Sequence, residues 1–345
     1  MILIKLGNMR FFVLFFMTAL LRTYFAQQQK NLEQCTVKEP WQPFVMVMAE
    51  RTGSSWETAL LNMHPNISMA GETFNPGSCS HLMCASEACD FLNNGRNHMY
   101  LPEPQSIAAR GFKIKYAFCV EFAHAKPNQT IIDKDIRDAC FGNPDKEYAL
   151  VKGTRRQLLF DYHAYFSLFS SVRPKLICSL RRNAVDVAIS KYFQILLYTS
   201  CGGISLLEKK EHKQCWKNVM TNFAADPEAI AKLVEGKHKQ GRLESRLCEM
   251  LSEKFPTFFL WYEDLLDDPL EGYRQLLSFL LGREPFSFFQ DAPLPAAHMT
   301  PVARPLDQMI VNTDEVIKAI EKSGHSFYLQ TSRTIDYPQY LSSCR

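Results

Sequence analysis

The feature of this sequence that most constrains its fold is a repeated unit: a short apolar run, then a polar turn, then a helical stretch. The clearest apolar runs are residues 44–48, 175–180 and 257–262. A short apolar run bounded by turn residues is typical of a buried strand in a parallel sheet. Strands that alternate with helices predict one α/β domain, a three-layer fold with a central parallel sheet flanked by helices.

Weaker patterns continue this alternation along the chain. Further strands are expected at residues 67–70, 111–116 and 148–152. Helices are expected up to Met63 and at about residues 156–169, 184–197, 213–255 with a break at Asp226-Pro227, and 270–281. Segments 73–110 and 123–146 are rich in turn-forming residues and are expected to be irregular, whereas the region after Gly282 gives no clear prediction.

Composition describes a folded protein with little net charge. The 345-residue chain is 46% hydrophobic, which supplies a sizeable core and excludes a largely disordered protein. It carries 39 Lys and Arg against 36 Asp and Glu, a net charge of +3. That excess is too small for general nucleic-acid binding, so any anion site must be local and no nucleic-acid partner is expected.

The amino-terminal segment has the pattern of a secretory signal. Lys5 and Arg10 precede the apolar run 11–21, which Arg22 ends. The run is shorter than the ~20 residues that span a bilayer. A good small-x-small cleavage site is missing, so a cleaved signal, an uncleaved type II anchor and a buried helix all stay open. The expected boundaries are signal or anchor 1–26, a polar stem 27–42 and a single domain 43–345.

Cysteine usage agrees with export. The chain has 11 Cys and no pair of CxxC motifs, so the spacing of a structural zinc site is missing and no metal is expected. In an oxidising compartment some of these cysteines should form disulfides, and the odd count leaves at least one outside them. The sequons that begin at Asn66 and Asn128 could accept glycans there.

The turn after the first expected strand has the residues of a phosphate-binding loop. It reads Arg51-Thr52-Gly53-Ser54-Ser55-Trp56. A strand that turns through Gly into a helix presents unpaired N–H groups and the positive end of the helix dipole, and the hydroxyls and Arg51 add donors. A triphosphate loop of the G-x-x-x-x-G-K-[ST] type is missing. The alternative is a serine helix cap beside an incidental arginine.

A second candidate anion site follows the strand expected at 175–180. Arg182 stands at the carboxyl end of that strand, and Ser190 lies about two turns along the next helix. An arginine and a hydroxyl that converge suit a phosphate monoester. Two such sites at the carboxyl ends of strands in one α/β sheet are much less expected by chance than either alone, and ligands of such sheets bind at this edge. The alternative is a basic strand end followed by an ordinary helix.

These two motifs together resemble the sulfotransferase family that uses 3′-phosphoadenosine 5′-phosphosulfate (PAPS). The first is similar to the family's 5′-phosphosulfate loop, R/K-x-G-[ST]-[ST]. Residues 182–186 with Ser190 and Tyr192 are similar to its 3′-phosphate motif, R-[DN]-[PA]-x-D followed by S-x-Y. Residues 259–265 with Asp268-Pro269 are similar to the later Y-E-D-L…D-P segment. The resemblance covers about residues 43–282 and implies a P-loop-like fold.

The resemblance also implies roles for individual residues. The loop 51–56 would hold the 5′-phosphosulfate, with Trp56 either flanking the adenine or packed in the core. Arg182 and Ser190 would hold the 3′-phosphate. Lys113 and Lys152 are rival cations for the transferring sulfuryl group, and the alternative for each is a solvated lysine at a strand end.

Sulfuryl transfer also requires a base for the acceptor hydroxyl, and the best candidate is Glu72. It follows His64-Pro65, as in the Golgi sulfotransferases of carbohydrates and of tyrosine that the sequence resembles. The alternative is a surface glutamate in a turn. The cytosolic branch uses a histidine base, but His124 and His163 lie in no matching motif, and that branch's R-K-G-x-x-G-D-W-K segment is missing.

Three function classes therefore remain in view. The leading one is a Golgi-lumenal sulfotransferase acting on a hydroxyl acceptor, most naturally a carbohydrate, with membrane attachment only through the N-terminal segment. A nucleotide-dependent kinase or NTPase is the second, although a triphosphate needs no separate 3′-phosphate site. A lumenal nucleotide-binding protein without catalysis is the third.

Overall fold

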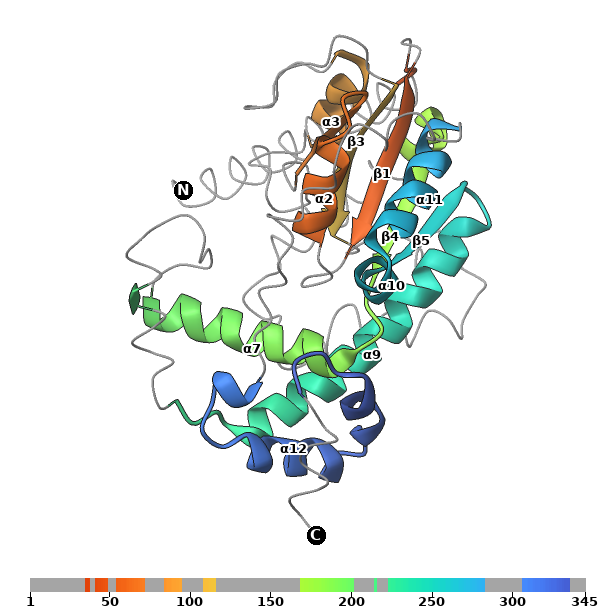
Figure 1. Ribbon diagram of the computed structural model, residues 1–345. Helices are drawn as coiled ribbons and strands as arrows, with labels where there is room; N and C mark the ends of the chain where they lie inside the picture. The colour runs from red at the N-terminus through yellow and green to blue at the C-terminus, as the bar shows by residue number, and fades with distance from the viewer. Residues whose placement is uncertain are drawn as a thin grey trace, which may run out of the picture. The chain divides into compact units, whose positions relative to one another are not determined.

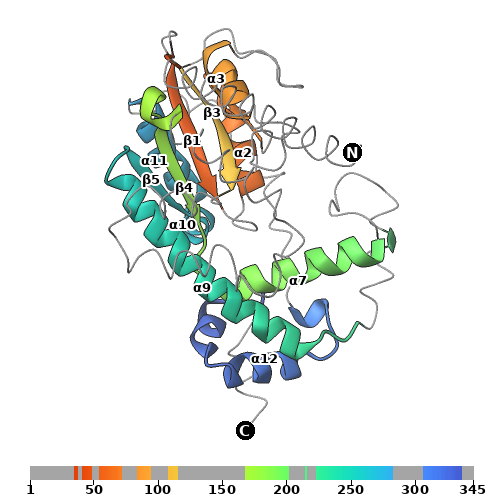
Figure 2. The same ribbon diagram turned by 180° about the vertical axis from the view of Figure 1, so that it is seen from behind.

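The computed structural model describes residues 35–37, 41–48, 54–71, 84–94, 108–115, 168–201, 214–215, 223–282 and 306–335. Five strands form one parallel sheet, in the order β2-β3-β1-β4-β5, and helices flank it (Figures 1 and 2). The strands are β1 (Gln42–Met48), β2 (Ile67–Ala70), β3 (Ala109–Lys115), β4 (Lys175–Leu180) and β5 (Thr257–Trp261). The predicted α/β class is confirmed.

The chain divides into two compact units. Unit 1 consists of Met1–Val47 and Leu61–Leu176, and unit 2 of Met48–Leu60 and Ile177–Arg345. Unit 1 contains β2, β3, most of β1 and the helix α3 (Cys84–Asn94). Most of β4 and all of β5 belong to unit 2. Its helices are α2 (Ser54–Asn62, up to Leu60), α7 (Ala184–Cys201), α9 (Pro227–Ser252), α10 (Tyr262–Asp267), α11 (Pro269–Leu281) and α12 (Thr313–Lys322).

The core of unit 1 is built from the buried strands. Phe44 and Met46 in β1 and Phe112 and Ile114 in β3 are fully buried, as expected for the strands predicted at residues 44–48 and 111–116. Gly111 leaves no room for a side chain, because an added Cβ would overlap the carbonyl oxygen and the ring of Phe44. A glycine is therefore required where these two strands approach each other.

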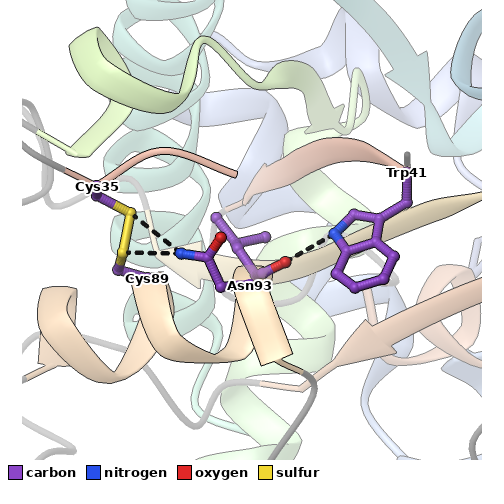
Figure 3. The surroundings of a disulfide bond; sticks show 5 residues. Cys35, Trp41, Cys89 and Asn93 are labelled. Atoms are coloured by element: carbon purple, nitrogen blue, oxygen red, sulfur yellow. Dashed lines mark hydrogen bonds between the residues drawn. A yellow bond between two sulfur atoms is a disulfide. The ribbon is translucent and has the colours of Figure 1, made fainter. Parts of the chain in front are cut away.

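Segment 73–110 contains α3, so the prediction of an entirely irregular segment was wrong. Ala88, Phe91 and Leu92 are buried, and their spacing of three and four residues is that of one helix face. Cys89 on this helix forms a disulfide with Cys35 (Figure 3). The bond ties the predicted stem region to α3.

Further contacts attach the start of β1 to α3. The indole N–H of Trp41 donates to the carbonyl of Leu92 at 2.7 Å (Figure 3). The guanidinium of Arg110 lies 4.1 Å from the centre of the Trp41 ring and donates to the carbonyl of Phe91 at 3.3 Å. A buried cation is thereby covered by aromatic faces.

Unit 2 is organised around α7 and α9, which lie side by side (Figures 1 and 2). Pro227 is the first residue of α9, and the Asp226 side chain caps the helix by accepting from the Ala229 N–H. The segment after Gly282, for which the sequence gave no prediction, contributes α12 and two 3-10 helices, η3 (Leu306–Gln308) and η4 (Ser326–Thr331). Their apolar residues complete the core with α7 and α9.

Two more disulfides stabilise unit 2. Cys178 in β4 is bonded to Cys248 in α9, and Cys201 at the end of α7 is bonded to Cys215.

Within the described part of the chain no helix combines the length and the apolar character needed to cross a membrane. The predicted signal segment 1–26, the strand at 148–152 and most of the helix at 156–169 lie outside the described residues.

Candidate active site

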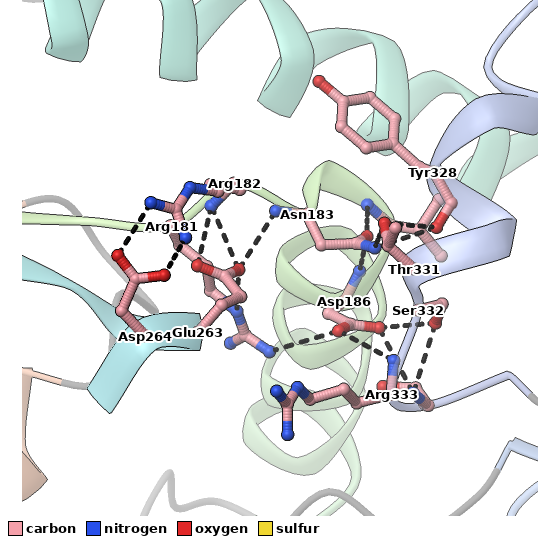
Figure 4. A network of polar contacts seen from close by, with 12 residues as sticks. Arg181, Arg182, Asn183, Asp186, Glu263, Asp264, Tyr328, Thr331, Ser332 and Arg333 are labelled. Carbon is pink, nitrogen blue, oxygen red and sulfur yellow. Dashed lines mark hydrogen bonds and ion pairs between the residues drawn. The ribbon is translucent and has the colours of Figure 1, made fainter. Parts of the chain in front are cut away.

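The turn between β4 and α7 is held by Asn183. Its side-chain oxygen accepts the N–H groups of Val185 and Asp186 at 3.0 and 3.1 Å, which makes it the cap of α7. Its amide nitrogen donates to the Tyr328 carbonyl and the Thr331 hydroxyl at 2.8 and 3.0 Å (Figure 4). One buried amide therefore joins the β4–α7 turn to η4.

Glu263, in the first turn of α10, accepts two further N–H groups of this turn. Glu263 accepts the Arg182 N–H with both oxygens at 3.0 Å and the Asn183 N–H at 3.1 Å. Asn183 and Glu263 together accept the N–H groups of Arg182, Asn183, Val185 and Asp186. Because the protein itself uses these four donors, an anionic ligand at this strand end would depend largely on side chains such as Arg182.

The two adjacent arginines have different environments. Arg181 is buried, with 9% of its side chain exposed, and it pairs with Asp186 at 3.7 Å and Glu263 at 3.9 Å. Its guanidinium also lies 4.5 Å from the centre of the Tyr262 ring. The Arg181 side chain therefore belongs to the internal structure of unit 2.

Arg182 has half of its side chain exposed, at 49%. Both of its terminal nitrogens donate to Asp264, one of them at 2.8 Å, and its guanidinium lies 4.6 Å from the centre of the Trp261 ring. The hydrogen bond to Asp264 raises the pKa of Arg182, and the same bond lowers the pKa of Asp264. The pair is accessible, so a phosphate could replace the carboxylate on Arg182.

Asp186 connects the start of α7 to the chain after η4. Its carboxylate accepts the Ser332 hydroxyl at 2.6 Å and the N–H groups of Arg333 and Thr334 at 3.1 and 3.3 Å (Figure 4). Asp186 is part of the second sequence motif, but the sequence alone assigned no role to it. Nothing in the sequence pattern marked Ser332 or Arg333 as its partners.

Trp56, the last residue of the first predicted motif, contacts the second motif indirectly, through Tyr262 and Arg181. The ring is half-buried in α2 and packs edge-to-face on Tyr262 with the ring centres 5.9 Å apart. Tyr262 in turn lies against Arg181. The Trp56 indole N–H is buried, and among the described residues no acceptor reaches it.

The other predicted site residues are placed as follows. Ser190 lies on α7, two turns after Arg182, and is partly buried. Lys113 is buried inside β3, with 4% exposed, so its alternative reading as a solvated lysine was wrong. The residues outside the described part are Arg51, Thr52, Gly53, Glu72 and Lys152, and the side chains of Ser54 and Ser55 are not described either.

The predicted base is preceded by a structural turn. Glu72 stands two residues after β2 in the sequence. His64 is buried and its Nδ1 accepts the Asn66 N–H at 3.2 Å. Burial lowers the pKa of His64 and favours the neutral ring that can accept this bond.

Comparison with known proteins agrees with this fold. The family model described as a sulfotransferase domain matches residues 42–285, and the chain belongs to that family. The protein is therefore a PAPS-dependent sulfotransferase that acts on a hydroxyl-containing acceptor. No curated protein matches the chain. Across the described residues, no group of His, Cys, Asp or Glu could hold a metal ion.

Proposed function

We propose that this sulfotransferase transfers the sulfuryl group of PAPS to a carbohydrate hydroxyl in the Golgi lumen. The observation that carries the nucleotide part of the proposal is the placement of Arg182: a half-exposed guanidinium at the carboxyl end of β4, directly before α7. Ligands of open α/β sheets bind at this end of the strands. Ser190 on the following helix offers the hydroxyl that completes the proposed 3′-phosphate site.

The described residues support nucleotide binding if Arg182 exchanges its present partner, Asp264, for a phosphate. Asp264 occupies the guanidinium of Arg182, so Arg182 would bind the 3′-phosphate only after releasing Asp264. An exposed ion pair of this kind contributes little stability, so replacing Asp264 by a phosphate would cost little free energy. The loop 51–56 would hold the 5′-phosphosulfate.

The proposed reaction is an in-line displacement at sulfur. The acceptor oxygen forms a bond to sulfur while the bond from sulfur to the phosphate oxygen breaks. Glu72 takes the proton of the attacking hydroxyl, and Lys113 or Lys152 stabilises charge on the departing oxygen. The leaving product is adenosine 3′,5′-bisphosphate.

Several features support a secretory compartment. The described cysteines form three disulfides, one within unit 1 and two within unit 2. Such bonds persist in oxidising compartments. The N-terminal segment 1–26 would serve as the signal or the type II anchor. Asn128 is the better candidate for a glycan, because Asn66 is half-buried and its carbonyl accepts two N–H groups from the start of β3.

The test is a transfer assay with the full chain expressed in the secretory pathway. Sulfur-labelled PAPS is supplied with oligosaccharides, a tyrosine peptide and a phenol as separate acceptors. We expect label on an oligosaccharide and a loss of about 10²–10⁴ in kcat for Glu72→Gln with unchanged bisphosphate binding. The matched control is Glu87→Gln, an exposed glutamate of α3. Label on the peptide or the phenol alone would contradict the carbohydrate assignment.

A further inference from the structure

Unit 2 contains a partly enclosed cavity of about 250 Å³ that borders the proposed 3′-phosphate site. Arg182 lines it, together with Trp261, the aromatic ring over which the Arg182 guanidinium lies. Ala184 and Val187 line it from α7. Ser190 follows Val187 by three residues, on the same side of that helix. The cavity is therefore adjacent to the place where Arg182 and Ser190 are proposed to hold a phosphate.

The volume of the cavity fits one part of a nucleotide. Sites that enclose a complete small molecule usually measure ~300–1,000 Å³, so this cavity suits a single group such as a ribose phosphate. A phosphate monoester carries a charge of about −1.5 to −2 at neutral pH. Arg182 supplies one positive charge, and the N–H groups of its turn are accepted by Asn183 and Glu263. A second cation from the cavity wall is therefore expected.

Three other positive or basic side chains of this wall already have partners. Arg181 is buried and pairs with two carboxylates. Lys237 donates to Gln240 at 2.8 Å and interacts electrostatically with Glu244, a buried carboxyl in the same wall. His238 is hydrogen-bonded to a tyrosine hydroxyl at 2.8 Å, and burial lowers its pKa, which favours the neutral ring. These three groups are therefore not counted as ligands for a phosphate.

Arg242 is the cation that remains among the described residues of this wall, and it is exposed. No carboxylate in the described part of the chain pairs with it. Burial and the charge of His325 lower the pKa of His238, and Arg242 lowers it further. Arg242 also opposes the rise in the pKa of Tyr328 that burial causes. Since His238 and Tyr328 both line the cavity, the Arg242 charge acts there and is open to a ligand.

We propose that Arg242 is a second cation of the nucleotide site and binds the 3′-phosphate of PAPS in this cavity together with Arg182. The inference rests on the nucleotide site proposed above. Two guanidinium groups can bind several oxygens of one phosphate through charge-assisted hydrogen bonds. Arg242 is then a specificity residue, because it distinguishes a nucleotide that carries a 3′-phosphate from one that does not.

The test is calorimetric titration of the full chain with adenosine 3′,5′-bisphosphate and with adenosine 5′-phosphate, which lacks the 3′-phosphate. Arg242→Gln removes a charge-assisted contact and should raise the dissociation constant of the bisphosphate about five- to tenfold. It should leave the dissociation constant of the 5′-phosphate unchanged. Arg242→Lys keeps the charge without the planar guanidinium and should recover part of the affinity.

The matched control is Arg246→Gln. Arg246 is an exposed arginine one turn further along α9 and does not line the cavity. This variant should bind both nucleotides as the parent does, because it removes the same charge from the same helix outside the proposed site. Circular dichroism melting checks that each variant is folded.

Four results would overturn the inference. If Arg242→Gln keeps the affinity for the bisphosphate while Arg182→Ala loses it, the cavity is not part of the site, although the proposed function stands. Equal weakening of both nucleotides by Arg242→Gln would show that Arg242 does not recognise the 3′-phosphate. If the parent does not prefer the bisphosphate, the proposed nucleotide site fails and the inference fails with it. Inorganic phosphate that binds the parent as tightly as the bisphosphate would show a site for a free ion.

Discussion

Arg181 and Arg182 are neighbours in the sequence, but their side chains differ in exposure and in partners. Arg181 is enclosed by Asp186, Glu263 and the Tyr262 ring, and it fixes the strand end. Arg182 projects into solvent, where Asp264 is its partner. The motif predicted from the sequence identified Arg182, but no sequence pattern distinguishes a buried arginine from an exposed one when they are adjacent, because burial is decided by distant partners.

Replacing Asp264 should strengthen nucleotide binding. Asp264→Asn removes the carboxylate that competes with a phosphate for Arg182, and exposed pairs are worth about 0.2–1 kcal/mol. We expect the dissociation constant for adenosine 3′,5′-bisphosphate to fall about two- to fivefold by calorimetry. Asp307→Asn, at an exposed carboxylate away from Arg182, is the control. Weaker binding by Asp264→Asn would show that Asp264 positions Arg182 for the ligand.

Glu244 should make the stability of the chain depend on pH. Its pKa is about 7 in the folded state and near 4.5 when unfolded, so the folded state binds the proton more tightly. The stabilising effect is complete below pH 4.5 and is lost as the pH rises through 7. Glu244→Gln should therefore match the parent near pH 4.5 and exceed its free energy of unfolding at pH 8 by up to on the order of 3 kcal/mol. Equal denaturation midpoints at pH 8 would contradict this.

At the scale of elements, the described strands were predictable from the sequence, whereas α3 and the helices after Gly282 were not. Apolar runs located β1, β4 and β5, and weaker patterns located β2 and β3, each to within two residues at either end. Buried parallel strands are apolar along most of their length, which makes such runs easy to find. The helix α3 was missed, since Cys, Asn and Ser obscured the buried face at Ala88, Phe91 and Leu92. The elements after Gly282 were missed because proline and polar residues gave no signal of their packing on α7 and α9.

Two glycines should respond to alanine in opposite directions. In Gly111→Ala the new Cβ overlaps the Phe44 backbone between β3 and β1, and we expect a loss of about 3 kcal/mol in the free energy of unfolding. Gly236 lies in α9 with open space around it, so Gly236→Ala should add about 1 kcal/mol. Chemical denaturation measures both. A Gly111→Ala protein as stable as the parent would contradict the close packing of the two strands.

The chain after η4 should loosen when Asp186 is replaced. Asp186→Asn weakens its contacts with Arg181, Ser332 and the N–H groups of Arg333 and Thr334. We expect faster amide hydrogen exchange in residues 332–335, with little change in α12. Uniform acceleration across both segments would instead indicate global destabilisation. Unchanged exchange would remove Asp186 from its connecting role.

At the scale of the whole molecule, the predicted nucleotide and transfer groups fall in different units. The loop 51–56, Arg182 and Ser190 belong to the segments of unit 2. Glu72, Lys113 and Lys152 belong to the segments of unit 1. Unit 2 should therefore retain nucleotide binding when the transfer groups are mutated. Sequence reasoning could list both sets from motifs, but the division between units depends on long-range packing that no local pattern encodes.

The most direct test of the account is calorimetric titration of the full chain with adenosine 3′,5′-bisphosphate, beside adenosine 5′-phosphate and ATP. A charge-assisted contact to the 3′-phosphate predicts at least tenfold tighter binding of the bisphosphate than of the 5′-phosphate. Arg182→Ala should abolish that preference, and Arg246→Ala, at an exposed arginine of α9, should keep it. Equal binding of all three nucleotides, or a preference that survives Arg182→Ala, would contradict the 3′-phosphate site.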